Sequence, residues 1–138
     1  MTPALFLGAA YTYTDAKRPD GLPEYRRVPH GGRIDARYLF DEGKGTVSLA
    51  AIGNSRTPDV AFPNDGLSFT ASRVQLAGYW TLQLAASYKI QPNIEVYGRI
   101  ENALGARYQE VYGYNTAGFG AYAGVKVKFD DLLGVAKK

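Results

Sequence analysis

The chain has 138 residues, enough for one domain, and no apolar run approaches the roughly 18 consecutive residues of a helical membrane span, so a helical membrane protein is excluded. A β-barrel membrane protein is not excluded, because its strands are only half apolar. The net charge of +3 is scattered along the chain, which argues against a nucleic-acid partner, and the lack of cysteine excludes thiol catalysis and disulfides.

Six β-strands are predicted along the chain, from runs in which apolar and polar residues alternate. Glycine, proline, asparagine and aspartate, the common residues of turns, separate these runs. The predicted strands cover about residues 4–15, 28–40, 46–55, 74–90, 94–103 and 119–129. The expected fold class is therefore all-β, with the strands arranged as an antiparallel meander.

The connections between these strands alternate between long and short. Tight turns are expected at 41–45 and 91–93, and long loops at 16–27, 56–73 and 104–118. Bacterial outer-membrane barrels show this asymmetry, with short periplasmic turns and longer extracellular loops. If the two tight turns are periplasmic, the last strand runs inward and ends in the periplasm.

The alternation is strictest in the last three predicted strands, where it marks transmembrane β-strands with one face in lipid. The lipid side is expected to carry Leu82, Leu84, Tyr88, Ile94, Val96, Ile100, Val125, Val127 and Phe129. The concave side is expected to carry Gln83, Lys89, Glu95, Arg99, Glu101, Lys126 and Lys128. The charged side chains either form a substrate track or pair across strands in a hydrated barrel interior.

Short motifs give the chain a resemblance to a known family. They are Tyr11-Thr-Tyr-Thr-Asp-Ala16, Arg27-Val-Pro-His30, Leu76-Ala-Gly-Tyr79, Arg99-Ile-Glu-Asn102 and Tyr112-Gly-Tyr-Asn115. In this order and spacing they resemble the C-terminal end of a TonB-dependent outer-membrane receptor, of the type that transports cobalamin or siderophores. The resemblance covers about residues 5–129.

The resemblance implies an antiparallel transmembrane β-barrel of about 22 strands, of which this chain supplies the last six or so. It implies a location in the outer membrane of a Gram-negative-type cell. The implied partners are outer-membrane lipid, the remainder of the barrel, a plug and, through the plug, TonB. The implied activity is active uptake of a large, scarce nutrient, either a siderophore–metal chelate or a corrinoid.

Three features of the chain favour a fragment of such a receptor. Six strands are too few for a closed transmembrane barrel, which begins at about eight. The first ten residues lack the positive region and the long apolar segment of a signal peptide. Residues 1–129 are predicted to form the barrel segment, and residues 130–138 a C-terminal extension beyond Phe129, where the family ends on an aromatic residue.

The third long loop is the predicted place for ligand binding. Tyrosine offers a large contact area and a hydroxyl group, which suits recognition of a bulky ligand. The alternative is that these tyrosines form the outer aromatic belt or pack the loop onto the rim of the barrel. The candidate substrate-binding residues are Arg107, Tyr108, Tyr112, Tyr114 and Asn115.

Neither a catalytic group nor a cofactor site is predicted, so the protein is not expected to be an enzyme. His30 is the only histidine, and Asp35 is the nearest carboxylate in sequence that could orient it. The aspartates of the loops lack the spacing of an EF-hand, and no metal site is expected. The loop aspartates considered are Asp15, Asp20, Asp59 and Asp65.

Two alternatives to the receptor hypothesis remain open from the sequence. One is a small outer-membrane β-barrel without transport activity. The other is a soluble all-β ligand-binding module of the lipocalin type, whose apolar face would point inward and whose charged face would contact water. Solubility of the chain without detergent would distinguish the soluble module from both membrane proteins.

Overall fold

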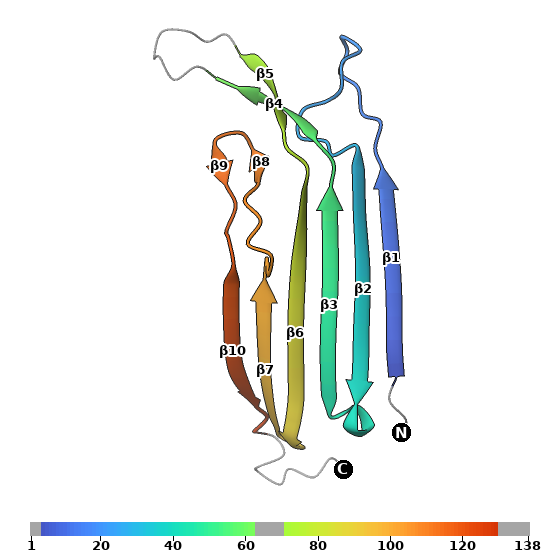
Figure 1. Cartoon of the computed structure of the whole chain (residues 1–138), viewed down its shortest axis with the longest axis vertical. Coiled ribbons are helices and arrows are strands. Elements are labelled where there is room, and N and C mark those ends of the chain that lie inside the picture. Colours follow the sequence, from blue (N-terminus) through green and yellow to red (C-terminus); the bar gives the residue numbers. More distant parts are fainter. Residues whose placement is uncertain (1–3, 63–70, 130–138) are drawn as a thin grey trace.

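The computed structural model describes residues 4–62 and 71–129, and these form an all-β structure. Six long strands make one antiparallel sheet in the order β1-β2-β3-β6-β7-β10, so neighbours in the sheet follow one another along the chain (Figure 1). They are β1 (Ala4–Tyr13), β2 (His30–Phe40), β3 (Gly45–Asn54), β6 (Tyr79–Gln91), β7 (Ile94–Glu101) and β10 (Gly120–Val127). The predicted meander of six strands is confirmed.

The connections differ at the two ends of the sheet. At one end, the 3₁₀ turn η1 (Asp41–Gly43) joins β2 to β3, and the two residues 92–93 join β6 to β7. At the other end are long loops, two of which contain short hairpins (Figure 1). These hairpins pair β4 (Thr57–Ala61) with β5 (Ser72–Leu76), and β8 (Gln109–Val111) with β9 (Tyr114–Asn115).

The sequence prediction was wrong about the regular structure of these loops. Residues 56–73 and 104–118 were expected to be irregular, yet each includes strand residues. The single strand expected at 74–90 is two strands, β5 and β6, with a break at residues 77–78. The turn signals Pro63 and Asn64-Asp-Gly66, and the tail 130–138, lie outside the described residues.

The break between β5 and β6 lies where two segments of backbone come very close. A Cβ atom on Gly78 would lie 2.8 Å from the carbonyl oxygen of Asn54, at the end of β3. Only glycine allows this approach. The chain can therefore leave the plane of the sheet at this point. The β4–β5 hairpin is thus part of the long loop between β3 and β6.

Strand register places every charged residue of the six long strands on one face of the sheet. Residues paired in an antiparallel register point to the same side, so the pairs Ile34–Ala51, Leu49–Leu84, Leu84–Ile100 and Val96–Val125 trace one face across five strands. On the opposite face lie Arg33, Asp35, Arg37, Gln83, Lys89, Glu95, Arg99, Glu101 and Lys126. The predicted separation of apolar and charged residues is confirmed, and we call these the apolar face and the polar face.

The apolar face carries aromatic residues near both of its ends. Tyr11, Tyr13 and Trp80 lie toward the long loops, and Tyr38, Phe40 and Tyr88 toward the short turns. Trp80 and Tyr88 are about 27 Å apart along β6, at roughly 3.4 Å per residue. An apolar band about 25 Å tall between two aromatic girdles is the outer surface of a transmembrane barrel.

The packing of Trp80 requires a glycine on the neighbouring strand. Gly53 of β3 is the register partner of Trp80, and a Cβ atom at Gly53 would lie 2.6 Å from the indole ring. A side chain at that position would displace Trp80 from the girdle.

The ion pairs of the polar face join residues of the same strand. Arg33 pairs with Asp35 at 2.6 Å, and Arg99 with Glu101 at 3.4 Å. The prediction of cross-strand ion pairs is therefore wrong for these residues, which are two positions apart on one strand. Across strands, the guanidinium of Arg99 instead lies 4.6 Å from the centre of the Tyr122 ring, a cation–π contact.

The sheet is a single layer without a conventional core. The chain exposes 10380 Å², whereas a folded globular protein of this mass exposes about 7,000 Å². Large side chains of the apolar face are uncovered: Leu7 is 75% exposed and Val125 is 62% exposed. Such a surface is stable only against lipid or another apolar partner.

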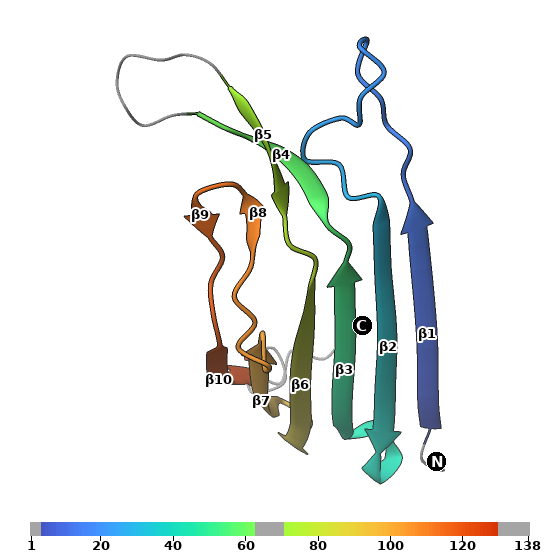
Figure 2. The same ribbon diagram turned by 45° about the horizontal axis from the view of Figure 1, so that its top comes forward.

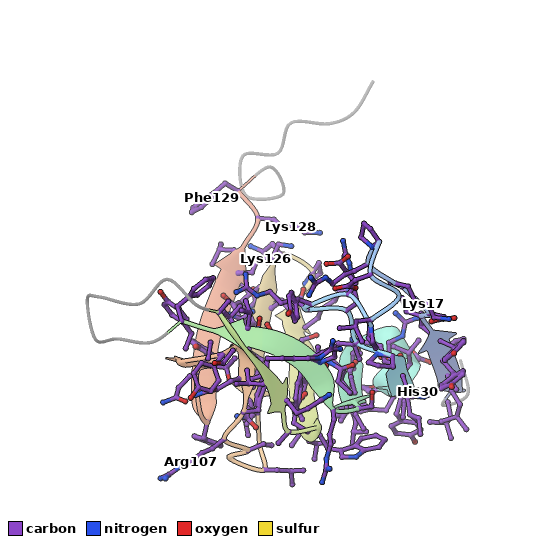
Figure 3. All side chains as sticks on the ribbon, turned by 90° about the horizontal axis from the view of Figure 1, so that it is seen from above. Lys17, His30, Arg107, Lys126, Lys128 and Phe129 are labelled. Atoms are coloured by element: carbon purple, nitrogen blue, oxygen red, sulfur yellow. The ribbon has the colours of Figure 1, made fainter. Side chains whose placement is uncertain are left out.

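The polar face is hollowed, and the outer strands do not meet. A hollow of about 460 Å³ is lined by charged residues of β2 and β7 and by Gln83 of β6. Viewed from above, Lys126 and Lys128 lie toward the edge of the sheet that β10 forms, and His30 lies toward the opposite edge (Figure 3). Within the described sheet, β1 and β10 each pair on one side only, so the six strands form an open wall.

The described part of the chain has no helix whose length and apolar character would let it cross a membrane.

Candidate functional site

The three long loops gather above one end of the sheet. The β4–β5 hairpin arches over the β8–β9 hairpin (Figure 2), and β5 contacts β8. The first loop joins them through the amide of Arg26, which donates to the carbonyl of Pro58 at 2.8 Å. Segments far apart in sequence thus form one structure, which we call the loop cluster.

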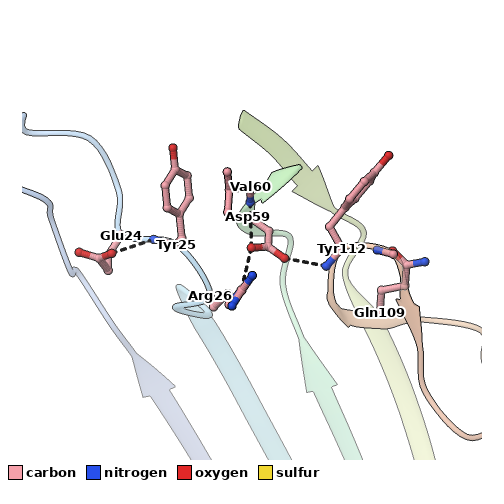
Figure 4. A network of polar contacts seen from close by, with 8 residues as sticks. Glu24, Tyr25, Arg26, Asp59, Val60, Gln109 and Tyr112 are labelled. Atoms are coloured by element: carbon pink, nitrogen blue, oxygen red, sulfur yellow. Dashed lines mark hydrogen bonds and ion pairs between the residues drawn. The ribbon is translucent and has the colours of Figure 1, made fainter. Parts of the chain in front are cut away.

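Asp59 is at the centre of the loop cluster, and its side chain is fully buried. Its Oδ1 accepts hydrogen bonds from the Arg26 Nε at 2.8 Å and the Val60 amide at 2.8 Å (Figure 4). Its Oδ2 accepts from the Tyr112 amide at 2.7 Å. One carboxylate therefore binds all three loops, and we call these four residues the Asp59 latch.

The electrostatics of the latch favour an ionised Asp59. Burial alone raises the pKa of a carboxyl group, because it removes water from the charged form. Hydrogen bonds from the amides of Tyr112 and Val60, together with the hydrogen bond and charge of Arg26, outweigh burial and lower the pKa of Asp59 below its usual value. The carboxylate is thus charged at neutral pH, and its charge is compensated.

Arg26 adopts a backbone conformation that is unusual for its residue type. Its φ of 58° lies in the left-handed region, which disfavours residues with a Cβ atom. The contacts of Arg26 with Pro58 and Asp59 hold it there. Backbone strain of this kind persists where surrounding contacts determine the conformation, and it is concentrated at functional sites.

Tyr79, at the start of β6, connects the sheet to the third loop. Its hydroxyl accepts a hydrogen bond from Asn54 Nδ2 at 2.7 Å and donates one to Glu110 Oε1 at 2.8 Å. Its ring stacks on Tyr108, with the centroids 3.8 Å apart. The stack fixes the stem of the third loop against the polar side of the sheet.

Asn102 closes the base of the same loop. Its side chain accepts from the Ala106 amide at 2.9 Å, and donates to the carbonyls of Ala106 and Ala117 at 2.9 and 3.3 Å. Its φ of 48° is tolerated by asparagine better than by most residues. One buried amide therefore ties the beginning of the loop to its end.

The structure places four of the five predicted binding residues in three environments. Tyr108 is packed against Tyr79, which supports the alternative that it holds the loop onto the rim. Tyr112 and Tyr114 flank the tip of the β8–β9 hairpin and are 49% and 74% exposed. Asn115 accepts a hydrogen bond from Gln109 Nε2 at 2.9 Å within that hairpin.

Arg107 stands apart from the other predicted residues. Its side chain projects outward from the ribbon (Figure 3), and no hydrogen bond or ion pair joins it to another described residue. At this end of the apolar face the aromatic girdle consists of Tyr11, Tyr13 and Trp80, and the β8–β9 hairpin lies beyond the ends of β7 and β10 (Figure 1). The structure therefore leaves Tyr112 and Tyr114 as the exposed aromatic pair of the predicted site.

Sequence reasoning missed the residues that organise the loop cluster. Asp59 was considered only as a calcium ligand, because nothing in the sequence predicts its pairing with Arg26, 33 residues away. Tyr79 and Asn102 both end motifs that carry the family resemblance, and this was the only signal for them. Asn102 was assigned to a strand end rather than to a loop.

His30 and the aspartates show no catalytic or metal-binding arrangement among the described residues. His30 Nδ1 lies 2.8 Å from the Tyr11 hydroxyl, and its amide donates to Ser55 Oγ at 3.1 Å. Asp35, expected as its possible partner, pairs with Arg33 instead. Within residues 4–62 and 71–129 there is no group of three histidine or acidic side chains that could hold a metal, and Asp65 lies outside the described residues.

No family model matches the sequence. Solved structures do match the fold, among them several of the ferripyoverdine receptor FpvA. The structure of the FpvAI–pyocin S2 complex matches with a TM-score of 0.76 and 16% identity, over 92% of this chain and 18% of that chain. The complex of Pseudomonas aeruginosa FpvA with a heterologous ferric pyoverdine matches with a TM-score of 0.75 and 15% identity, over 89% and 17%.

A third match is the pyoverdine outer-membrane receptor FpvA of Pseudomonas aeruginosa PAO1 bound to pyoverdine. It has a TM-score of 0.72 and 18% identity, over 94% of this chain and 20% of that chain. At these identities the likeness shows the fold: the chain has the fold of part of the β-barrel of these receptors. The chain spans about a fifth or less of the length of the receptors it matches.

Proposed function

We propose that this chain forms part of the barrel wall and extracellular loops of an outer-membrane receptor for an iron chelate of the siderophore type. The polar face lines the interior, the apolar face contacts lipid, and the loop cluster faces the outside of the cell. In this proposal TonB supplies the energy for uptake through a plug that this segment does not contain. Corrinoid uptake is the alternative for the ligand.

The observation that carries the proposal is the two-sided sheet. An arginine or lysine on the lipid side of a barrel costs about 2–4 kcal/mol at the bilayer midplane. The apolar face of the long strands is free of charge and is bounded by two aromatic girdles. A soluble module of the lipocalin type would enclose its apolar face, whereas here Leu7 and Val125 of that face are exposed.

The fold comparison and the loop cluster support an iron chelate as the ligand. Two of the matching structures are named as a ferripyoverdine receptor and a pyoverdine outer-membrane receptor. In this chain, the Asp59 latch holds the β8–β9 hairpin so that Tyr112 and Tyr114 are exposed. Rigid, exposed tyrosines bind large ligands at a small cost in conformational entropy.

Uptake of an iron chelate should therefore depend on the hairpin tyrosines. We expect the double variant Tyr112→Ala and Tyr114→Ala, made in the full-length protein, to raise the Kd for the chelate about 30-fold or more, since loss of an important interface tyrosine costs about 1 kcal/mol or more. The measurement is binding and uptake of radioactive iron as ferric pyoverdine and other ferric siderophores by cells that produce the protein. Cyanocobalamin is the probe for the corrinoid alternative.

The matched control is Leu104→Ala, which removes an exposed apolar side chain (65% exposed) from the same loop but outside the hairpin. It should leave binding unchanged. Failure of the unmodified protein to bind or import any of the ferric siderophores, with saturable cyanocobalamin uptake, would favour the corrinoid alternative. Unchanged binding and unchanged uptake of ferric siderophores in the double variant would refute the role of the hairpin.

A further inference from the structure

A small pocket lies beneath the loop cluster, separate from the hairpin tyrosines. It has a volume of about 210 Å³ and is lined by Arg26, Val28, Asn54, Thr57, Leu76, Ala77, Tyr79, Gln109 and Glu110. Its walls come from the first loop, the end of β3, the β4–β5 hairpin and the third loop. Pockets for whole drug-sized ligands measure about 300–1,000 Å³, so this pocket fits a single small group.

The lining of the pocket is in part buried and in part exposed and charged. Leu76 and Thr57 are buried, and they line the pocket together with Val28. Arg26 and Glu110, of opposite charge, are both exposed and line the same pocket. A site with this distribution of charge matches a group that carries both signs.

Both charged side chains are held in place, yet each keeps free hydrogen-bonding atoms. Arg26 is bound to Asp59 through Nε, and Glu110 accepts from Tyr79 through Oε1. Among the described residues, the terminal nitrogens of Arg26 and Oε2 of Glu110 have no hydrogen-bond partner. Side chains that are already fixed lose little conformational entropy when a ligand binds.

Amide groups complete the lining. Asn54 and Gln109 lie in the wall. Asn54 Nδ2 donates to the Tyr79 hydroxyl, whereas Gln109 donates to Asn115 through Nε2 and accepts from the Gly113 amide through Oε1. They line the same pocket as the two charged side chains. The arrangement suits a short polar group that bears a carboxylate at one end and an ammonium at the other.

From this geometry we propose that the pocket binds a small zwitterionic group of the α-amino acid type, with its carboxylate toward Arg26 and its ammonium toward Glu110. As a statement about the transported ligand, this rests on the proposed function: it predicts that the chelate carries such a group. As a statement about the pocket, it can be tested without any chelate.

The test is saturation-transfer NMR on the full-length protein in detergent micelles, with three probes of similar size. Glycine carries both charges, N-acetylglycine only the negative one and glycinamide only the positive one. We expect a saturable signal for glycine, with a Kd at least five times lower than for either single-charge probe. Glu110→Gln should weaken glycine binding at least fivefold and leave N-acetylglycine unchanged, because glutamine can still accept from Tyr79.

Two further variants keep the result interpretable. Ala77→Leu should fill the pocket and abolish the glycine signal without changing any charge. Lys17→Gln, which removes an exposed cation of the first loop that does not line the pocket, should leave the glycine signal unchanged. Equal binding of the three probes, or glycine binding that persists in Ala77→Leu, would overturn the proposal, whereas failure of chelate binding with intact glycine binding would count only against the receptor function.

Discussion

Replacing Leu84 by arginine should lower the free energy of unfolding of the protein in a lipid bilayer by about 2–4 kcal/mol. Leu84 is the register partner of both Leu49 and Ile100, so it lies in the middle of the apolar face. In the proposed orientation of the barrel wall that face contacts hydrocarbon, where a guanidinium group loses its hydration. The measurement is a denaturant titration of the full-length protein refolded into phospholipid vesicles.

The matched control is Gln83→Arg, one residue away on the polar face. Neighbouring residues of a strand point to opposite sides, so this arginine lies in the water-filled interior, and a change within about 0.5 kcal/mol is expected. Equal losses of unfolding free energy in the two variants would show that both faces contact the same solvent. A larger loss for Gln83→Arg would reverse the assignment of the faces.

Replacing Asp59 by alanine should release the third loop from the other two. The Tyr112 amide then loses its partner, and Arg26 keeps a strained backbone without its carboxylate. We expect the free energy of local opening at Tyr112 to fall by about 1–3 kcal/mol. The ion pair contributes only a small share of this loss, because Arg26 is half exposed. Hydrogen exchange at the Tyr112 and Val60 amides measures this loss.

The same latch should depend on pH in a defined direction. The pKa of Asp59 is lowered in the folded protein, so its stabilising contribution is complete above the unfolded value of about 3.9 and is lost as the pH falls through the folded pKa. Protection of the Tyr112 amide should therefore be constant from pH 5 to pH 7, after correction for intrinsic exchange, and should decrease at lower pH.

Asp59→Asn should remove the pH dependence, since an amide does not titrate in this range. Asp15→Ala serves as the control, because it removes a carboxylate of the first loop whose one contact among the described residues is an exposed ion pair with Lys17. Its effect on the Tyr112 amide should be negligible. Full protection of that amide in Asp59→Ala would show that Asp59 does not hold the loops together.

The sheet could be predicted from the sequence because its signals are local. Alternation with a period of two is visible in each strand separately, and the order of an antiparallel meander follows from the short turns at 41–44 and 92–93. The assignment of Leu84 and Arg99 to opposite faces needed no knowledge of the neighbouring strands. Strand ends differ from the prediction by at most two residues for most of the sheet.

The loop cluster could not be predicted in the same way, because its contacts are not local. Tyr112 and Asp59 are 53 residues apart, and Tyr79 and Glu110 are 31 residues apart. No periodic pattern marks such pairs. The β4–β5 hairpin was missed because its strands are short and Pro58 lies in one of them, and proline within a run argues against a strand.

The assignment of the two faces to lipid and to water can be measured directly by spin labelling of β6, and these 138 residues contain no cysteine that would compete for the label. Single cysteines at positions 82 to 87 of β6, each carrying a nitroxide spin label in the full-length protein in bilayers, report access to oxygen and to a water-soluble nickel complex. Positions 82, 84 and 86 should favour oxygen, which concentrates in lipid, and positions 83, 85 and 87 should not. Access that fails to alternate along β6, or that alternates with the opposite phase, would contradict this assignment.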